Sequence, residues 1–228
     1  TGTGIMGQDC PETKTQIQTK AGTGAEALEA ASGGLRKVTL ERATKETKIR
    51  LTLNLDGRGE AKVSTGIGFF DHMLEGFARH GFFDLELSVE GDLQVDTHHT
   101  IEDTGIVLGK AIQEAVGDKK GIVRYGSRIL PMDDALLLCA LDLCGRPYLV
   151  YDLRLTQERV GQLETEMVRE FFYAVSYGAQ MNLHLKQLEG SNCHHIIEGA
   201  LKAFAKALDE ATRYDSRITD VLSTKGSL

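Results

Sequence analysis

Two copies of one short pattern carry the clearest chemistry in this sequence. The segments His98–Glu102 and His194–Glu198 both read HHxxE, and each falls at the start of a predicted helix. On a helix, positions i and i+4 lie one above the other, while position i+1 points about 100° away. The first histidine and the glutamate of each copy can therefore hold one metal ion together, whereas the second histidine is directed at a different ion. Two copies that face each other would build two sites, each with a His–Glu pair from one helix and a lone histidine from the other.

The repeat predicts one further ligand in each half. His72 precedes His98 by 26 residues, and Glu170 precedes His194 by 24 residues in the equivalent helix. The eight candidate ligands, four for each ion, are then His72, His98, His99, Glu102, Glu170, His194, His195 and Glu198. Imidazole and carboxylate ligands without thiolate suit Mn²⁺, Fe²⁺ or Zn²⁺, and four protein ligands on an octahedral ion leave positions open for a substrate. One HHxxE alone is as easily a pair of exposed histidines, but two copies, which together with His72 account for five of the seven histidines, favour a metal site.

Basic residues beside turns are candidates for binding a phosphate group. Arg124 follows a Gly-Ile-Val segment, Arg146 lies in a Gly-Arg-Pro turn, and Lys225 lies in a Ser-Thr-Lys-Gly segment. Arginine forks suit phosphate oxygens, although each residue taken alone is more often a surface charge. Candidate acid–base groups, for each of which a helix cap or solvated carboxylate is the simpler interpretation, are Glu46, Asp71, Glu75, Asp103, Asp133 and Asp134. His80 and His184 fall outside the metal pattern and favour structural roles.

Composition narrows the class of protein. The 228 residues are 41% hydrophobic and 26% charged, as in an ordinary soluble globular protein. The formal net charge of -7, with no Trp, argues against a nucleic-acid partner. The four cysteines form no CxxC pair, which favours a reducing compartment, either cytoplasm or plastid stroma. No apolar run approaches the ~20 residues of a membrane span, so we expect no membrane partner.

Hydrophobic periodicity predicts the elements that position these residues. Residues 1–34 are rich in Gly, Thr and Ala and predict a flexible tail or linker, followed by one domain over 35–228. In the first half the pattern predicts a strand over 49–55, a turn at 56–59 and a returning hairpin partner at 60–64. A helix over 69–79, closed by Gly81, and a strand over 83–89 follow. The last predicted element of this half is a helix from about His98 to Val116, capped by Asp96 or Thr97.

The second half repeats this order. Its apolar runs at 134–143 and 147–153 are followed by a predicted helix over 163–178, a strand over 181–188 and a helix over 192–211. Each half is therefore hairpin, helix, strand, helix. The prediction is an α+β fold made of two pseudo-repeats, about 38–120 and 121–215, with a C-terminal tail.

The sequence resembles the imidazoleglycerol-phosphate dehydratase family of histidine biosynthesis. The matching stretches, in family order, are FFDHML at 69–74, DTHHTIED at 96–103, GRPY at 145–148, NLH at 182–184, GSNCHHIIE at 190–198 and STKG at 223–226. They cover the chain from about Val38 to its end. The sequence departs from the common pattern of this family at four positions. Glu170 stands where many members have His, Gly68 replaces a frequent Pro, Gly76 replaces a polar residue, and Leu201 replaces a common Phe.

The resemblance implies a fold like domain 2 of ribosomal protein S5, with two sheets and helices packed together. It implies trimers that assemble into a homo-24-mer, with two Mn²⁺ ions in each active site and active sites between subunits. By motif, the histidines at 72, 98, 99, 194 and 195 carry over as ligands with Glu102 and Glu198. The positions that match phosphate-binding residues are Arg124, Arg146, Ser223 and Lys225. Glu46 and Asp133 match residues near the substrate.

The implied reaction is the dehydration of D-erythro-imidazole-glycerol phosphate to imidazole-acetol phosphate. Metal ions on the two ring nitrogens would make the ring an electron reservoir that expels the neighbouring hydroxyl group. A carboxylate must move the proton, and Glu198 or Glu102 is the first candidate. Two alternatives stand beside this hydro-lyase hypothesis. One is a dinuclear metal hydrolase of a phosphate ester or amide, and the other is a non-catalytic shell protein assembled by metal.

Overall fold

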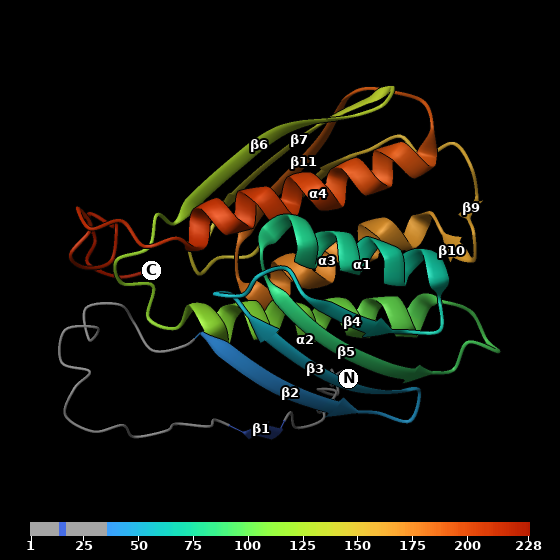
Figure 1. Cartoon of the computed structure of the whole chain (residues 1–228), viewed down its shortest axis with the longest axis horizontal. Helices are drawn as coiled ribbons and strands as arrows, with labels where there is room; N and C mark the ends of the chain where they lie inside the picture. Colours follow the sequence, from blue (N-terminus) through green and yellow to red (C-terminus); the bar gives the residue numbers. More distant parts are fainter. Residues whose placement is uncertain (1–13, 17–35) are drawn as a thin grey trace, which may run out of the picture.

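The computed structural model describes Lys14–Gln16 and residues 36–228. Apart from the three residues Lys14–Gln16, which form strand β1, the predicted tail at 1–34 lies outside the described residues. From residue 36 onward the chain forms two mixed sheets with helices between them (Figure 1). The predicted α+β class is therefore confirmed.

The first half builds one sheet with the order β1-β2-β3-β5-β4. Its elements are β1 (Lys14–Gln16), β2 (Lys37–Ala43), β3 (Thr47–Asn54), β4 (Ala61–Ser64), α1 (Gly68–Gly81), β5 (Asp84–Gly91) and α2 (His98–Val116). Neighbouring strands are antiparallel except β4 and β5, which run parallel. A parallel pair needs a crossover connection, which α1 provides. Ile49, Leu51 and Leu53 of β3 are buried and alternate with outward residues, as the sequence pattern predicts.

The second half repeats the same connectivity in a sheet of order β6-β7-β11-β8. Its elements are β6 (Tyr125–Met132), β7 (Ala135–Asp142), β8 (Tyr148–Asp152), β9 (Arg159–Val160), β10 (Leu163–Glu164), α3 (Glu166–Ala179), β11 (Asn182–Glu189) and α4 (Cys193–Thr212). Here β8 and β11 form the parallel pair, and β9 and β10 form a separate hairpin. The order β2-β3-β5-β4 thus corresponds strand for strand to β6-β7-β11-β8, so the unit is duplicated. The exact limits of the two pseudo-repeats stay a prediction.

The structure corrects four local predictions. In the second half, the apolar runs at 134–143 and 147–153 do not form a hairpin, because β7 pairs with β6 and β11, whereas β8 pairs with β11. Residues 60–64 are not the hairpin partner of 49–55, because β5 pairs with both β3 and β4 and lies between them. The hairpin partner of β3 is β2. The left-handed residue that ends α1 is Phe82, with φ 58°, and not Gly81. Gly81 lies inside the helix, where a Cβ would come within 2.2 Å of the Phe83 ring. Helix α3 begins at Glu166 and not at 163, because β10 pairs with β9 first.

The helices pack in two pairs, α1 with α4 and α2 with α3, so each pair joins the two halves of the chain. Between α1 and α4, the rings of Phe77 and Phe204 stack with centroids 5.5 Å apart, and Phe172 of α3 meets Phe204 edge-on. Between α2 and α3 the backbones themselves touch. A Cβ at Gly109 would lie 2.6 Å from the carbonyl oxygen of Val175. This close approach requires glycine.

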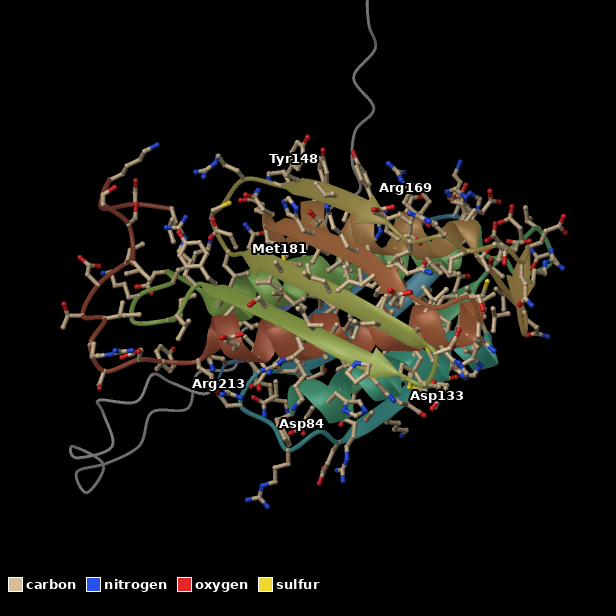
Figure 2. All side chains as sticks on the ribbon, turned by 90° about the horizontal axis from the view of Figure 1, so that it is seen from above. Asp84, Asp133, Tyr148, Arg169, Met181 and Arg213 are labelled. Carbon is tan, nitrogen blue, oxygen red and sulfur yellow. The ribbon has the colours of Figure 1, made fainter. Side chains whose placement is uncertain are left out.

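The described helices all point the same way. Each follows a strand that ends at one end of the molecule, so the N-terminal ends of α1 to α4 gather there, at the right in Figure 1. The C-terminal tail lies at the opposite end. Figure 2 shows the same separation from above, with Asp133 at the first end and Arg213, which directly follows α4, at the other. Across the described part of the chain, no helix combines the length and apolar character needed to span a membrane.

Candidate functional site

A group of three candidate ligands meets between α1 and α4. One ligand atom each from His72, His194 and Glu198 lies within 4.8 Å of the others. His194 and Glu198 share one face of α4 at positions i and i+4, with 3.0 Å between Nε2 and a carboxylate oxygen. The packing of α1 on α4 brings His72 to them, and the Phe69 ring lies against the His194 ring at 5.0 Å. Two imidazoles and a carboxylate are a ligand set that a divalent transition metal accepts.

Glu198 is held as a carboxylate by its neighbours. Lys202, one turn later on α4, lies 2.7 Å from a Glu198 oxygen. Burial alone would raise the pKa of Glu198. The hydrogen bond and charge of Lys202, together with His194 and His72, outweigh burial and hold that pKa below its ordinary value. The group can therefore ligate a cation or accept a proton at neutral pH.

A cavity of about 290 Å³ opens beside this group. Six of the residues that line it are His72, Gly76, Arg79, His80, Glu198 and Lys202. Nothing stands within 4 Å of a Cβ built on Gly76, so the absent side chain at this position leaves the cavity wider. Burial and the charge of Lys202 lower the pKa of His80, which favours its neutral form.

The first half repeats the His–Glu pair but not the three-residue group. His98 Nε2 lies 3.4 Å from Glu102, again at i and i+4. Glu170 of α3, the candidate ligand predicted at the place equivalent to His72, pairs with the adjacent Arg169 at 2.9 Å. Among the described residues, only the group on α1 and α4 brings three such ligands together. Within the described part of the chain, no group of ligands combines residues of both HHxxE turns. Their convergence stays a prediction for neighbouring copies.

The second histidine of each HHxxE turn is held by carboxylates. His99 Nδ1 lies 2.9 Å from Asp92, and its Nε2 lies 3.8 Å from Glu46. The hydrogen bond to Asp92 outweighs burial and raises the pKa of His99.

In the other turn, His195 Nδ1 lies 2.7 Å from Asp134, and its Nε2 lies 3.3 Å from Asp133. Hydrogen bonds from the Ser191 backbone and from His195 lower the pKa of Asp134 well below its ordinary value. Glu46 and Asp133, predicted from the family to lie near the substrate, thus stand beside the candidate ligands.

The predicted phosphate-binding residues line one cavity at the opposite end. Arg124, Arg146, Ser223 and Lys225 all border a cavity of about 810 Å³ enclosed by the C-terminal tail. Asp142 orients Arg124 through hydrogen bonds of 2.7 and 3.0 Å, and the third nitrogen of Arg124 donates to the Leu222 carbonyl. The geometry groups the four residues, and their role stays a prediction.

Sequence reasoning missed two residues of the site, and two of its acid–base candidates have structural roles. Asp92 and Lys202 were not candidates, although both contact the histidines or glutamate of an HHxxE turn. Lys202 could have been found at position i+4 from Glu198, whereas Asp92 lies in a loop with no periodic signal. Asp71 accepts hydrogen bonds from Thr65 just before α1, as the cap interpretation expects. Asp103 is neither a cap nor solvated, because it is buried and pairs with half-buried Arg42.

Comparison with known proteins identifies the family. The sequence pattern of imidazoleglycerol-phosphate dehydratase matches residues 65–208. The imidazoleglycerol-phosphate dehydratase of Lachnoclostridium phytofermentans is 62% identical over 193 residues, which cover 85% of this chain and 98% of that protein. That of Acetivibrio thermocellus is 59% identical over 193 residues, 85% of this chain and 99% of that protein.

Solved structures agree. The imidazoleglycerol-phosphate dehydratase of Staphylococcus aureus superposes with a TM-score of 0.71 at 37% identity, covering 78% of this chain and 98% of that one. The enzyme of Pyrococcus furiosus, in complex with (S)-C348, gives a TM-score of 0.71 at 35% identity, covering 82% of this chain and 99% of that one. With the paired HHxxE turns and the duplicated fold, these matches show that the chain belongs to the imidazoleglycerol-phosphate dehydratase family.

Proposed function

We propose that this imidazoleglycerol-phosphate dehydratase of histidine biosynthesis is metal-dependent, with two Mn²⁺ ions in each active site. The substrate is D-erythro-imidazole-glycerol phosphate and the products are imidazole-acetol phosphate and water. The observation that carries the proposal is the approach of His72, His194 and Glu198 to within 4.8 Å. Family membership argues against a hydrolase or a non-catalytic shell protein.

The donor set fits the proposed metal. Two imidazole nitrogens and one carboxylate oxygen, without a cysteine sulfur among them, suit Mn²⁺, with Fe²⁺ or Zn²⁺ as alternatives. We assign the first ion to this group. The second ion takes His98, Glu102 and Glu170, because α2 packs on α3 as α4 packs on α1. His99 and His195 each complete a site in a neighbouring copy.

We propose that each active site lies between copies of the chain. The metal group sits near the start of α4, and the tail cavity lies beyond its end. A helix of 20 residues is about 30 Å long. The substrate joins its imidazole ring to its phosphate through a three-carbon chain shorter than about 8 Å. One molecule cannot reach both ends of one chain, so the tail cavity of one copy must meet the metal end of another. This requirement supports a symmetric homo-oligomer, for which the family suggests trimers that build a 24-mer.

Each group of residues then has its own role in the proposed elimination. Bound metal would supply Lewis-acid stabilisation of the ring as negative charge builds on it. Arg124, Arg146 and Lys225 bind the phosphate, and this remote binding energy orients the carbon chain. Glu198, ionised as described above, accepts the proton from the middle carbon of the chain, while the hydroxyl group departs as water from the carbon that bears the ring, with Glu102 as the alternative base. The enol formed in this way takes up a proton on the ring-bearing carbon and becomes the ketone of imidazole-acetol phosphate.

Mixed assembly of two inactive variants tests this function. His194→Ala removes a ligand at one end, and Lys225→Ala removes a cation at the other. Each alone is expected to lose most turnover of imidazole-glycerol phosphate, followed by ultraviolet absorbance of the enol product. Assembled together, about one site in four should combine an intact metal end with an intact cavity and regain activity. The doubly substituted chain mixed with wild type is the control for dilution. Absence of any recovery in the mixed assembly would exclude shared sites.

Metal dependence has its own measurement. Removal of metal with a chelator should abolish turnover, and Mn²⁺ should restore it. His194→Ala should lose bound Mn²⁺ together with activity, whereas Lys225→Ala should retain the metal. A chelated enzyme with full activity would contradict the proposal. The relatives named above from Lachnoclostridium and Acetivibrio are bacterial, which supports bacterial cytoplasm rather than plastid stroma as the compartment.

A further inference from the structure

We infer that Asp92 and Asp134 are positioning residues that fix the proton of His99 and His195 on Nδ1 and so leave Nε2 free to bind metal. The inference rests on the proposed metal function and assigns a role to two carboxylates outside the ligand set. Its starting observation is that both second histidines of the HHxxE turns have a carboxylate on the same ring nitrogen, at 2.9 Å for His99 and 2.7 Å for His195.

The chemistry of the contact determines the tautomer. An ionised carboxylate only accepts hydrogen bonds, so the Nδ1 atom that faces it must carry the proton. The carboxylates that face Nε2 lie farther away, Glu46 at 3.8 Å from His99 and Asp133 at 3.3 Å from His195, so the shorter contacts at Nδ1 hold the proton. A neutral imidazole then has its lone pair on Nε2. In metalloproteins a carboxylate on the far nitrogen orients a ligating histidine and raises its basicity.

The two aspartates lie at places that are not equivalent in the duplicated fold. Asp92 follows β5 and lies in the loop that leads into α2. Asp134 lies in the turn between β6 and β7. In the fold, the counterpart of that turn is the turn between β2 and β3, where Glu46 lies and not Asp92. Duplication alone therefore does not account for the shared contact. A shared need for a carboxylate at Nδ1 of both histidines would account for it.

The surroundings of the two aspartates differ, and this difference makes the inference testable. The Oδ2 atom of Asp134 also accepts hydrogen bonds from the backbone N–H groups of Ser191 and Asn192, at 2.7 and 3.1 Å. The second oxygen of Asp92, Oδ1, is buried and has no hydrogen-bond partner among the described residues.

An asparagine substitution should thus act differently at the two positions. In Asp134→Asn, the two backbone N–H groups require the amide oxygen on their side, so the NH₂ group faces His195. That arrangement moves the imidazole proton to Nε2 and blocks metal binding there. In Asp92→Asn, the amide can turn its oxygen toward His99 and keep the tautomer, so only the charge is lost.

The experiment measures Mn²⁺ affinity of the full chain from the free-Mn²⁺ electron paramagnetic resonance signal. We expect Asp134→Asn to weaken binding at one class of site about 10- to 100-fold, and Asp92→Asn to weaken it less. Thermal unfolding of each metal-free variant is measured beside it. Asp134→Asn should lose some stability, because its carboxylate accepts hydrogen bonds from two backbone N–H groups, but both metal-free variants should remain folded at the assay temperature. Asp118→Asn removes the same charge from an exposed aspartate at the far end of α2 and should change neither quantity.

Two results would overturn the inference. One is wild-type affinity in Asp134→Asn. The other is a loss of affinity in both variants that follows an equal loss of thermal stability in the metal-free proteins, since that pattern indicates a structural role. Failure of the wild-type chain to bind Mn²⁺ would instead refute the metal proposal itself, and this inference with it.

Discussion

Two glycines inside helices should respond in opposite directions to the same substitution. Gly109 of α2 lies where the backbones of α2 and α3 touch, and a Cβ there would come within 2.6 Å of the Val175 oxygen and 2.9 Å of the Ala179 nitrogen. Gly76 of α1 has nothing within 4 Å of the same added atom. Both lie in helix interiors, where replacement of Gly by Ala favours the helix by about 1 kcal/mol.

The magnitudes follow from these contacts. In Gly109→Ala the atoms that must move belong to the backbone, so the overpacking cost lies near the upper limit of about 3 kcal/mol. The net change is then a loss of about 2 kcal/mol in the free energy of unfolding. Gly76→Ala has no overpacking cost and should gain about 1 kcal/mol.

Urea denaturation of the metal-free variants, at one protein concentration, measures both changes. The separation of α2 from α3 in Gly109→Ala should also weaken the second proposed metal group, because α2 carries His98 and Glu102 while α3 carries Glu170. Greater stability of Gly109→Ala than of wild type would refute the close-approach argument. So would equal destabilisation by both substitutions.

Three further predictions concern the core, the tail cavity and acid stability. Phe77→Ala removes a ring that stacks on Phe204 and should cost about 3–5 kcal/mol in denaturant unfolding; a loss under 1 kcal/mol would show that α1 and α4 pack by other contacts. Asp142→Asn weakens the two hydrogen bonds that orient Arg124 and should raise KM for the substrate more than it lowers kcat. An unchanged KM would contradict the proposed binding of phosphate by Arg124. Burial would raise the pKa of Asp84, but hydrogen bonds from backbone N–H groups outweigh burial and lower this pKa below 3.8. The ionised carboxylate therefore stabilises the fold above about pH 4, and this stabilisation is lost as the pH falls through the lowered pKa. Asp84→Asn should therefore be less stable than wild type at neutral pH, with the difference shrinking toward about pH 3; a constant difference would exclude the linkage.

Much of the fold could be predicted because its signals are local. Alternation of apolar residues located β3, β5 and β11, and the predicted bounds of α2 agree with the observed ones. The order of the strands could not be obtained in this way. Periodicity shows which face of a strand is buried but not which strand lies beside it, so β4 was assigned to β3 when it pairs with β5.

In the candidate site, too, the residues with a local spacing signal could be predicted, whereas those brought near by the fold could not. The HHxxE spacing and the repeat predicted His72, His194 and Glu198 as ligands but not that these three lie together, which the structure shows. The carboxylate on His99 could not be foreseen, because Asp92 reaches it through the fold of a loop. Among the described residues, Glu170 belongs to no group of three candidate ligands, which a site shared between copies, as proposed above, would explain.

The common direction of the four helices has an electrostatic consequence for the end that holds the histidines. Each helix N-terminus acts as roughly half a positive charge, and helices aligned in parallel add their dipoles where antiparallel ones would cancel. Left alone, that field would repel a divalent cation and attract an anion. The carboxylates clustered there, among them Glu46, Asp92, Asp133 and Asp134, oppose that field, so acidic side chains outside the proposed ligand set help this end of the molecule to attract a cation.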